Sequence, residues 1–225
     1  GEFYASQSLW DSQGRRVQYG WVRSSPAAQS IPRLVQLERS STGNSSDDRI
    51  VFLPLPEMAL LHDEHRPFKS VTVAPGDPGK SSVKPLVTSS DDFGLHMHAR
   101  ATVSLPNGSC NSTVSIVQGG GGVYVDIHCG NAMANLGVLV PGLAPGRQNA
   151  ASKKTVWSKR LASGAPVQID VFVDGSIVEI FAAGEVTTLG VAPKNSYGVE
   201  IGAEASPAVF DVDLWSMKPA VSPPC

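Results

Sequence analysis

Short runs of alternating apolar and polar residues dominate the chain, and clusters of turn-forming residues separate them. Two such runs, Phe3 to Trp10 and Arg16 to Val22, flank Asp11-Ser12-Gln13-Gly14 at the start of the chain, which predicts a β-hairpin. An unpaired strand at a free end is poorly held. We therefore expect that the chain was cut from a longer precursor just before Gly1.

The strongest hairpin pattern lies near the middle of the second half, where Gln168 to Val173 and Ser176 to Phe181 flank Asp174-Gly175. The other strand-like runs share this short length and close spacing: Lys69 to Val73, Lys84 to Thr88, Leu95 to Leu105, Thr113 to Gln118, Val123 to Ile127, Thr187 to Val191, Tyr197 to Ile201 and Val209 to Trp215. Many short strands without intervening helices predict an all-β fold, with two antiparallel sheets packed as a β-sandwich over residues 68–225.

Two segments differ from the strand pattern. Pro56 to His65 has helical character and precedes Arg66-Pro67, so residues 56–67 are predicted to be a linker that contains a short helix. Asn131 to Lys154 shows no clear period and many Gly, Ala, Pro and Asn residues, which favours a long connection.

The composition is that of a globular protein, with 41% hydrophobic and 17% charged residues. The formal net charge is -2, and neither sign gathers into a long block, which argues against a nucleic-acid partner. No apolar run approaches the roughly 20 residues that span a bilayer, and no leader opens the chain, so we expect no membrane insertion.

Three N-glycosylation sequons begin at Asn44, Asn107 and Asn111, each within a polar stretch. Three sequons in one chain favour secretion, with a signal upstream of Gly1. The predicted location is extracellular, in the cell wall, or in a vacuolar or other lumenal compartment.

The cysteines fit an oxidising compartment. Cys110 and Cys129 flank two strand-like runs joined by Gly119 to Gly122, and a hairpin there would bring both thiols to disulfide geometry. Cys225 is left over, either as a free thiol or as a tether to another chain.

Five segments, in the same order along the chain, resemble glycoside hydrolase family 32, which includes invertases, inulinases, fructan hydrolases and fructosyltransferases. They are Gly1 to Ser6, Arg15 to Val22, Ile31 to Leu34, Phe172 to Phe181, and Asp213 to Met217. The resemblance implies a five-bladed β-propeller followed by a β-sandwich. Residues 1–55 would be the last part of the propeller.

The family hydrolyses β-fructofuranosides by the retaining route, which needs a nucleophilic carboxylate and a carboxylic acid about 5 Å apart. In the family these groups and a stabilising Asp lie in Asn-Asp-Pro, Arg-Asp-Pro and Glu-Cys segments, none of which occurs in this chain. The resemblance therefore implies no catalytic residue here and an N-terminal catalytic chain of the same precursor as partner. A small sugar is the expected substrate, no cofactor is implied, and the sandwich could also support a homo-oligomer.

Three aromatic residues of the opening hairpin, Tyr4, Tyr19 and Trp21, are the candidates for contact with sugar, because aromatic faces stack on sugar rings. A role in the core is the competing interpretation for each. The alternatives for the whole protein are a fructosyltransferase of the same family and a non-catalytic carbohydrate-binding or adhesion module.

Several other residues have a structural interpretation that we prefer to a chemical one. Asp174 and Glu179 fit a turn and a cross-strand or interface position. His62 and His65, predicted on one solvated helical face, and His96 and His98, on one strand face, lack a third ligand, so no metal site is expected. Gly119 to Gly122 lacks the features of a phosphate loop, and Ser6 and Ser8 have no nucleophile-elbow pattern.

Overall fold

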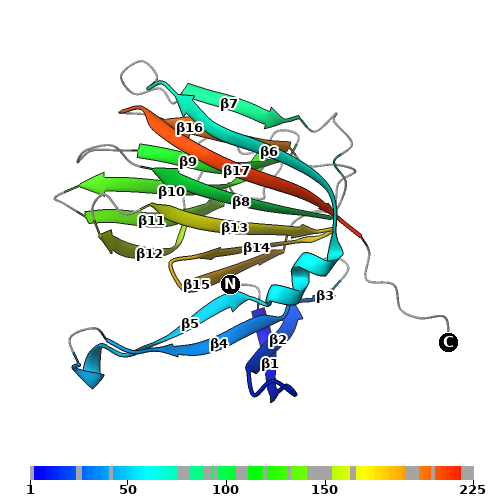
Figure 1. Ribbon diagram of the computed structural model, residues 1–225. Coiled ribbons are helices and arrows are strands. Elements are labelled where there is room, and N and C mark those ends of the chain that lie inside the picture. The colour runs from blue at the N-terminus through cyan, green and yellow to red at the C-terminus, as the bar shows by residue number, and fades with distance from the viewer. Residues whose placement is uncertain are drawn as a thin grey trace.

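The computed structural model describes residues 3–23, 27–40, 43–75, 82–88, 93, 96–104, 111–118, 121–130, 133–140, 154–162, 166–190, 198–203 and 206–218. The described residues form three antiparallel sheets and two short 3-10 helices, η1 (Ser45–Asp47) and η2 (Pro56–Leu61). Two sheets form the upper body in Figure 1, and the third lies below them. This arrangement confirms the all-β prediction.

The lower sheet contains the first part of the chain. Its strands follow the order β1 (Phe3–Trp10), β2 (Arg16–Val22), β4 (Arg33–Glu38) and β5 (Arg49–Pro54), and β3 (Ala28–Gln29) pairs with β2. The path β1-β2-β4-β5 of this five-stranded sheet is a four-stranded antiparallel meander, the arrangement of a propeller blade, and we call it the four-stranded sheet. The opening hairpin is confirmed with both predicted strands intact.

The turn of this hairpin is held by one side chain. Asp11 Oδ1 accepts hydrogen bonds from the backbone N–H groups of Gln13 at 2.9 Å and Arg15 at 2.8 Å. Gly14 adopts φ 72°, which glycine reaches without steric cost. The sequence Asp11-Ser12-Gln13-Gly14 therefore reverses the chain as predicted.

The upper body is a sandwich of two six-stranded sheets. The inner sheet, which faces the four-stranded sheet, has the order β15 (Glu185–Gly190), β14 (Ile177–Ala182), β13 (Val167–Asp174), β8 (His96–Ser104), β17 (Ala208–Met217) and β6 (His62–Val73). The other sheet has the order β12 (Lys154–Ala162), β11 (Met133–Val140), β10 (Gly121–Gly130), β9 (Asn111–Gln118), β16 (Gly198–Ala203) and β7 (Ser82–Val87).

The core lies between the two sandwich sheets. Met97, Ile169 and Leu214 of the inner sheet and Ile127 and Ile201 of the other are fully buried there. Burying a side chain of this size contributes roughly 1.5–3 kcal/mol relative to leaving it exposed. Because side chains alternate along a strand, the intervening residues of the inner sheet point to its outer face, toward the four-stranded sheet.

The helix near residue 60 is shorter than predicted. Only Pro56–Leu61 is helical, as the 3-10 helix η2, and β6 begins at His62, so residues 62–67 belong to a strand rather than to the predicted linker. The register pairs His65 with Trp215 and Pro67 with Asp213. Pairing with β17 overrides the local helical pattern, and the edge position of β6 tolerates the proline.

The predicted long connection from Asn131 to Lys154 is wrong in part, because Met133–Val140 forms β11 and Lys154–Ala162 forms β12. The sequence of β11 does not alternate between apolar and polar residues. The strand is nevertheless held in the sheet, because it pairs with β10 on one side and β12 on the other. Residues 141–153 lie outside the described residues.

The strongest predicted hairpin is confirmed as β13 and β14, with its turn one residue later than expected. Asp174 pairs with Ile177, so Gly175 and Ser176 form the two-residue turn. Gly175 adopts φ 55°, which explains the glycine at this position.

Candidate functional site

The four-stranded sheet meets the sandwich at a buried ion pair. Arg33 Nη2 on β4 lies 2.8 Å from Glu179 Oε1 on β14, and the two side chains are 5% and 0% exposed. Thr188 donates to Glu179 Oε1 at 2.7 Å, and the N–H of Ile31 donates to Oε2 at 3.2 Å. The Arg33 guanidinium also lies over the Phe3 ring, 3.9 Å from its centroid.

This ion pair confirms the interpretation of Glu179 as an interface residue. Burial raises the pKa of the Glu179 carboxyl, while the charge of Arg33 and the hydrogen bond from Thr188 act in the opposite direction. Arg33 Nε is buried without a hydrogen-bond partner among the described residues. Asp174, by contrast, lies at the exposed end of β13 and contacts His96 Nδ1 at 2.5 Å.

A second contact between the four-stranded sheet and the sandwich, the two parts of the structure, depends on a glycine. The N–H of Phe52 on β5 donates to the carbonyl of Gly184 at 2.8 Å, so β5 runs beside the β14–β15 turn (Figure 1). Gly184 adopts φ +78°, and a Cβ there would lie 2.7 Å from Val51 Cγ1. A larger residue at position 184 would be strained by the positive φ and would require Val51 to move.

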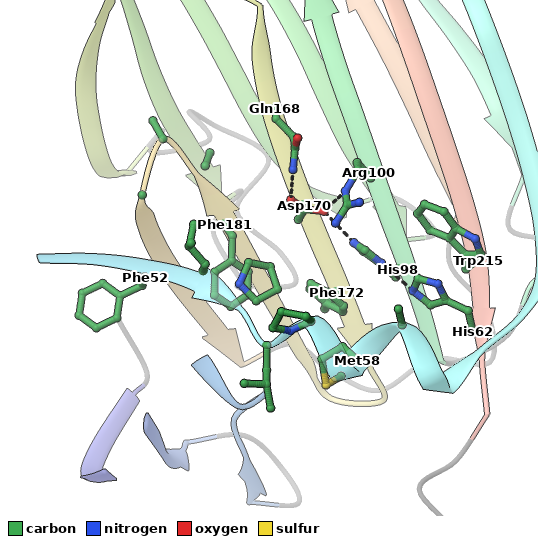
Figure 2. A pocket seen from close by; sticks show the side chains of 18 residues that line it. Phe52, Met58, His62, His98, Arg100, Gln168, Asp170, Phe172, Phe181 and Trp215 are labelled. Carbon is green, nitrogen blue, oxygen red and sulfur yellow. Dashed lines mark hydrogen bonds and ion pairs between the residues drawn. The ribbon is translucent and has the colours of Figure 1, made fainter. Parts of the chain in front are cut away.

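Between these contacts and β17 lies a cavity of about 540 Å³, the candidate site. One wall comes from β5 and η2, including Phe52 and Met58, and the other comes from the outer face of the inner sheet (Figure 2). The second wall carries the polar side chains Arg100, Gln168 and Asp170. The first wall is therefore apolar, whereas the second carries the polar groups next to the aromatic residues Phe172, Phe181 and Trp215. We call the part of the second wall that carries His62, His98, Arg100, Gln168 and Asp170 the polar wall.

A hydrogen-bonded chain of side chains crosses the polar wall. His62 Nε2 lies 2.9 Å from His98 Nδ1, and His98 Nε2 lies 2.9 Å from Asp170 Oδ1. Arg100 Nε donates to the same Oδ1 at 2.6 Å, and Gln168 Nε2 donates to Asp170 Oδ2 at 2.9 Å. Figure 2 shows these contacts converging on Asp170.

The protonation states of Asp170, His98 and His62 follow from the hydrogen bonds that they accept and donate. Burial alone would raise the pKa of Asp170, but hydrogen bonds from His98 and Gln168 hold the pKa below its usual value. An ionised carboxylate only accepts, so His98 carries its proton on Nε2 and accepts from His62 through Nδ1. Burial lowers the pKa of His98, and desolvation together with the neighbouring His98 and Arg100 lowers the pKa of His62 to about 4.

Aromatic stacking holds the imidazole rings of His62 and His98 in place. His62 stacks on Trp215 with ring centroids 4.4 Å apart, and His98 stacks on Phe172 with centroids 4.0 Å apart. Trp215, His98, Phe172 and Glu179 are successive cross-strand neighbours on β17, β8, β13 and β14. The cavity wall and the buried ion pair are thus parts of one row on the sheet.

The three predicted sugar-contact residues lie together but away from this cavity. Tyr4 pairs with Trp21 across β1 and β2, and Tyr19 is two residues from Trp21 on the same strand. Tyr4 is 43% and Trp21 53% exposed, and Tyr19 is half-buried. None of the three side chains is fully buried among the described residues, which does not favour the competing interpretation of a role in the core.

Of the predicted glycosylation sites, Asn44 is exposed and caps η1, where its side chain accepts from the N–H of Ser46. Asn107 lies outside the described residues, and Asn111 is the first residue of β9. Cys110 and Cys225 lie outside the described residues, whereas Cys129 lies on β10. Asn111 and His128, the chain neighbours of Cys110 and Cys129, are paired in the ladder.

The histidines are arranged differently from the prediction. His62 and His65 lie on a strand and both stack on Trp215, whereas His98 is buried and bonded to Asp170. In the part of the chain that the structure describes, no group of three or more His, Cys, Asp or Glu side chains is placed to hold a metal ion. No helix in that part is long and apolar enough to cross a membrane.

Sequence reasoning missed Arg33, Arg100 and Asp170 as site residues. The available signal was a polar or charged residue at alternate positions of an otherwise apolar, β-branched strand, as in Gln168-Ile169-Asp170-Val171. Such a residue faces away from the core and needs a partner if something covers it.

Comparison with known proteins gives matches in structure but not in sequence. No protein-family model and no curated protein sequence matches the chain. A fructan 1-exohydrolase IIa from Cichorium intybus matches with a TM-score of 0.71 at 14% identity, over 98% of this chain and 49% of that one. A fructosyltransferase from A. japonicus matches with a TM-score of 0.67 at 12% identity, over 100% of this chain and 45% of that one.

A third solved structure is a variant of a family 32 β-fructofuranosidase from Bombyx mori in complex with sucrose. It matches with a TM-score of 0.60 at 14% identity, over 99% of this chain and 42% of that one. This chain therefore has the fold of a part of these enzymes and spans less than half of their length.

Proposed function

We propose that the chain is the C-terminal part of a secreted glycoside hydrolase of family 32, of the β-fructofuranosidase type, that acts on sucrose or fructans. The observation that carries the proposal is the match to a fructan 1-exohydrolase over 98% of the chain, across both the four-stranded sheet and the sandwich. The five sequence segments that resemble the family occur in the same two parts.

In this proposal the chain does not carry the reaction itself. The retaining mechanism needs two carboxylates about 5 Å apart in the propeller funnel. The sequence contains none of the three family segments that supply them. A separate N-terminal chain of the same precursor would supply these groups, and this chain would complete the propeller and brace it through the Arg33–Glu179 ion pair.

Exposed apolar side chains on the four-stranded sheet support a partner at that surface. They are distributed over β1, β2, β4 and β5: Leu9, Trp10, Trp21, Leu37, Ile50 and Leu53. Apolar surface gathered on one sheet is typical of an interaction site. Blades that pack on both sides of this sheet would bury it.

Intact mass and N-terminal sequencing of the protein from its source test the partner directly. We expect a second, larger chain that copurifies and contains an Asn-Asp-Pro segment. A monodisperse and stable monomer of the 225-residue chain, with no second chain, would contradict the proposal.

Enzyme assays of the same material test the reaction. Sucrose hydrolysis should release fructose with retained anomeric configuration, which NMR detects before mutarotation. If the intact complex leaves sucrose and fructans unchanged, the rival hypothesis of a non-catalytic carbohydrate-binding or adhesion module takes its place.

Transfer of fructose to another sugar is the second candidate, because a fructosyltransferase from A. japonicus shares the fold at a TM-score of 0.67. Incubation with concentrated sucrose separates the two. Only glucose and fructose as products would exclude transfer, whereas longer oligosaccharides that accumulate would exclude simple hydrolysis.

The proposal places the protein in an extracellular or lumenal compartment, because the sequence contains three sequons. Enzymatic removal of N-glycans should lower the mass of the native chain, with Asn44 occupied because its side chain is exposed. An unchanged mass would remove the sequons as support for this location. Light scattering of the complex would show whether the sandwich also forms a homo-oligomer.

A further inference from the structure

The cavity between η2 and the inner sheet has hydrogen-bonding groups without a partner among the described residues. Asp170 engages only Nε of Arg100 and only the amide nitrogen of Gln168. Within the described residues, the Arg100 Nη atoms, Gln168 Oε1 and His62 Nδ1 make no hydrogen bond. These atoms comprise two donor groups and two acceptors on the polar wall.

Each of these groups belongs to a side chain that a neighbouring residue anchors. His62 is held by His98 and Trp215, and Arg100 and Gln168 are both held by the buried carboxylate of Asp170. Side chains fixed before binding lose little conformational entropy on binding. The polar wall is therefore ready to receive a ligand.

The polar wall carries no net charge, which favours a neutral ligand over an ion. Arg100 is balanced by the ionised Asp170, and the lowered pKa values of His62 and His98 keep both imidazoles neutral near pH 7. A neutral ligand that both donates and accepts hydrogen bonds fits this wall. Hydroxyl groups on neighbouring carbons have this property.

The opposite wall requires an apolar face on the same ligand. Leu55, Met58 and Ala59 supply that wall, with Met58 visible on η2 in Figure 2, and Phe172 and Phe181 add aromatic surface on the side of the inner sheet. A volume of about 540 Å³ lies within the range of small-molecule sites and holds one or two sugar rings. A sugar ring has C–H groups on its face and hydroxyl groups on its edge.

We infer that this cavity is a binding site for a neutral sugar, which places its C–H face on Met58 and Ala59 of η2 and its hydroxyls on Arg100, Gln168 and His62. The inference goes beyond the proposed function, because binding here needs neither hydrolysis nor an N-terminal chain. Its residues all lie in this chain.

The test uses ¹⁵N-labelled protein, kept with any chain that copurifies, titrated with fructose and with methyl α-D-glucopyranoside. Neither probe contains a fructofuranosyl glycosidic bond, so an active enzyme leaves both unchanged. At least one probe should shift the Gln168 amide, the Arg100 Nε–H and the Trp215 indole signals to saturation. We expect a dissociation constant on the order of millimolar, because a single ring makes few contacts.

Two substitutions in η2 make a matched pair. Ala59 lines the cavity, so Ala59→Trp should fill it and weaken binding by about tenfold or more. Leu60 is 80% exposed and does not line the cavity, so Leu60→Trp should leave binding unchanged. Gln168→Leu, at an exposed residue, gives a third variant that removes one acceptor and should weaken binding several-fold.

Three results would overturn the inference. The first is signal shifts that stay linear and are matched by glycerol at equal hydroxyl concentration. The second is equal affinity in the Ala59→Trp, Gln168→Leu and Leu60→Trp proteins. The third is saturable binding of cyclohexanol with no binding of either sugar, which would assign the cavity to an apolar ligand. Sucrose hydrolysis by the same sample is measured separately, so failure of the proposed function remains distinguishable.

Discussion

His62 Nε2 lies 2.9 Å from His98 Nδ1, so the edge strand β6 and the interior strand β8 are linked by one imidazole-to-imidazole hydrogen bond. This bond needs an unprotonated His98 Nδ1. Arg100 adds positive charge near His62, and Asp170 faces only the far nitrogen of His98. A second proton in this cluster is therefore unfavourable.

The first prediction concerns stability at low pH. Desolvation and the neighbouring His98 lower the pKa of His62 to about 4 in the folded protein, against about 6.5 in an unfolded chain. Between these values the unfolded state binds a proton that the folded state refuses, so the free energy of unfolding falls as the pH drops from 6.5 to 4. Urea unfolding across this range measures the slope, and His62→Gln should make it shallower.

The second prediction concerns the buried ion pair. Glu179→Ala leaves the Arg33 guanidinium buried without a counter-charge and should lower the free energy of unfolding by roughly 3–5 kcal/mol. The double variant Arg33→Met with Glu179→Leu should lose less than the single variant, because no charge stays buried. Urea titration gives both values.

A surface pair serves as the control for this experiment. Glu64 and Arg66 are 55% and 38% exposed, and Glu64→Ala should cost at most about 1 kcal/mol. Equal losses for Glu179→Ala and Glu64→Ala would show that the buried pair does not hold the two parts together.

The third prediction concerns the aromatic residues of the opening hairpin. If Tyr4, Tyr19 and Trp21 contact sugar in the assembled enzyme, Trp21→Ala should lower kcat/KM for sucrose roughly tenfold, which corresponds to about 1.4 kcal/mol of transition-state binding. Leu60 is 80% exposed on η2, outside the sheet proposed to meet the partner, and Leu60→Ala is the control. Identical kinetics of the two variants would remove the sugar-contact assignment.

The fourth prediction concerns the cysteines. Peptide mapping without reduction should recover Cys110 joined to Cys129, because the adjacent residues Asn111 and His128 are paired in the ladder. Loss of this disulfide in Cys129→Ser should lower stability by about 2–4 kcal/mol. Free thiols at both positions in the native protein would refute the pairing, and mapping also shows whether Cys225 joins the partner chain.

Local patterns were sufficient to predict most strands. The β1–β2 and β13–β14 hairpins each depend on turn residues and alternation within about twenty residues or fewer, and both are confirmed. The start of β6 was not predictable in this way, because His62 is a strand residue only through its pairing with Met217 on β17. β11 is held by neighbours on both sides and needs no alternation of its own.

The candidate site was harder to predict than the fold. Glu179 could be assigned to an interface from its place in an apolar strand, but nothing near it in sequence identifies Arg33 as its partner. The cavity likewise depends on which residues of β8 and β13 share a face, and that requires the register Asp170 to Arg100. Register between strands distant in sequence follows from the folded core rather than from local pattern.

The distance between Arg33 and Glu179 along the sequence also determines when the two residues can pair during synthesis of the chain. They lie 146 residues apart, and at a synthesis rate of about 5–20 residues per second Arg33 waits roughly 7 to 30 s for its partner to emerge. During that interval its guanidinium stays hydrated and the N–H of Phe52 lacks the Gly184 carbonyl. The four-stranded sheet can dock only after the sandwich strand β14 has been made, so translation speed sets the earliest moment at which the two parts can join.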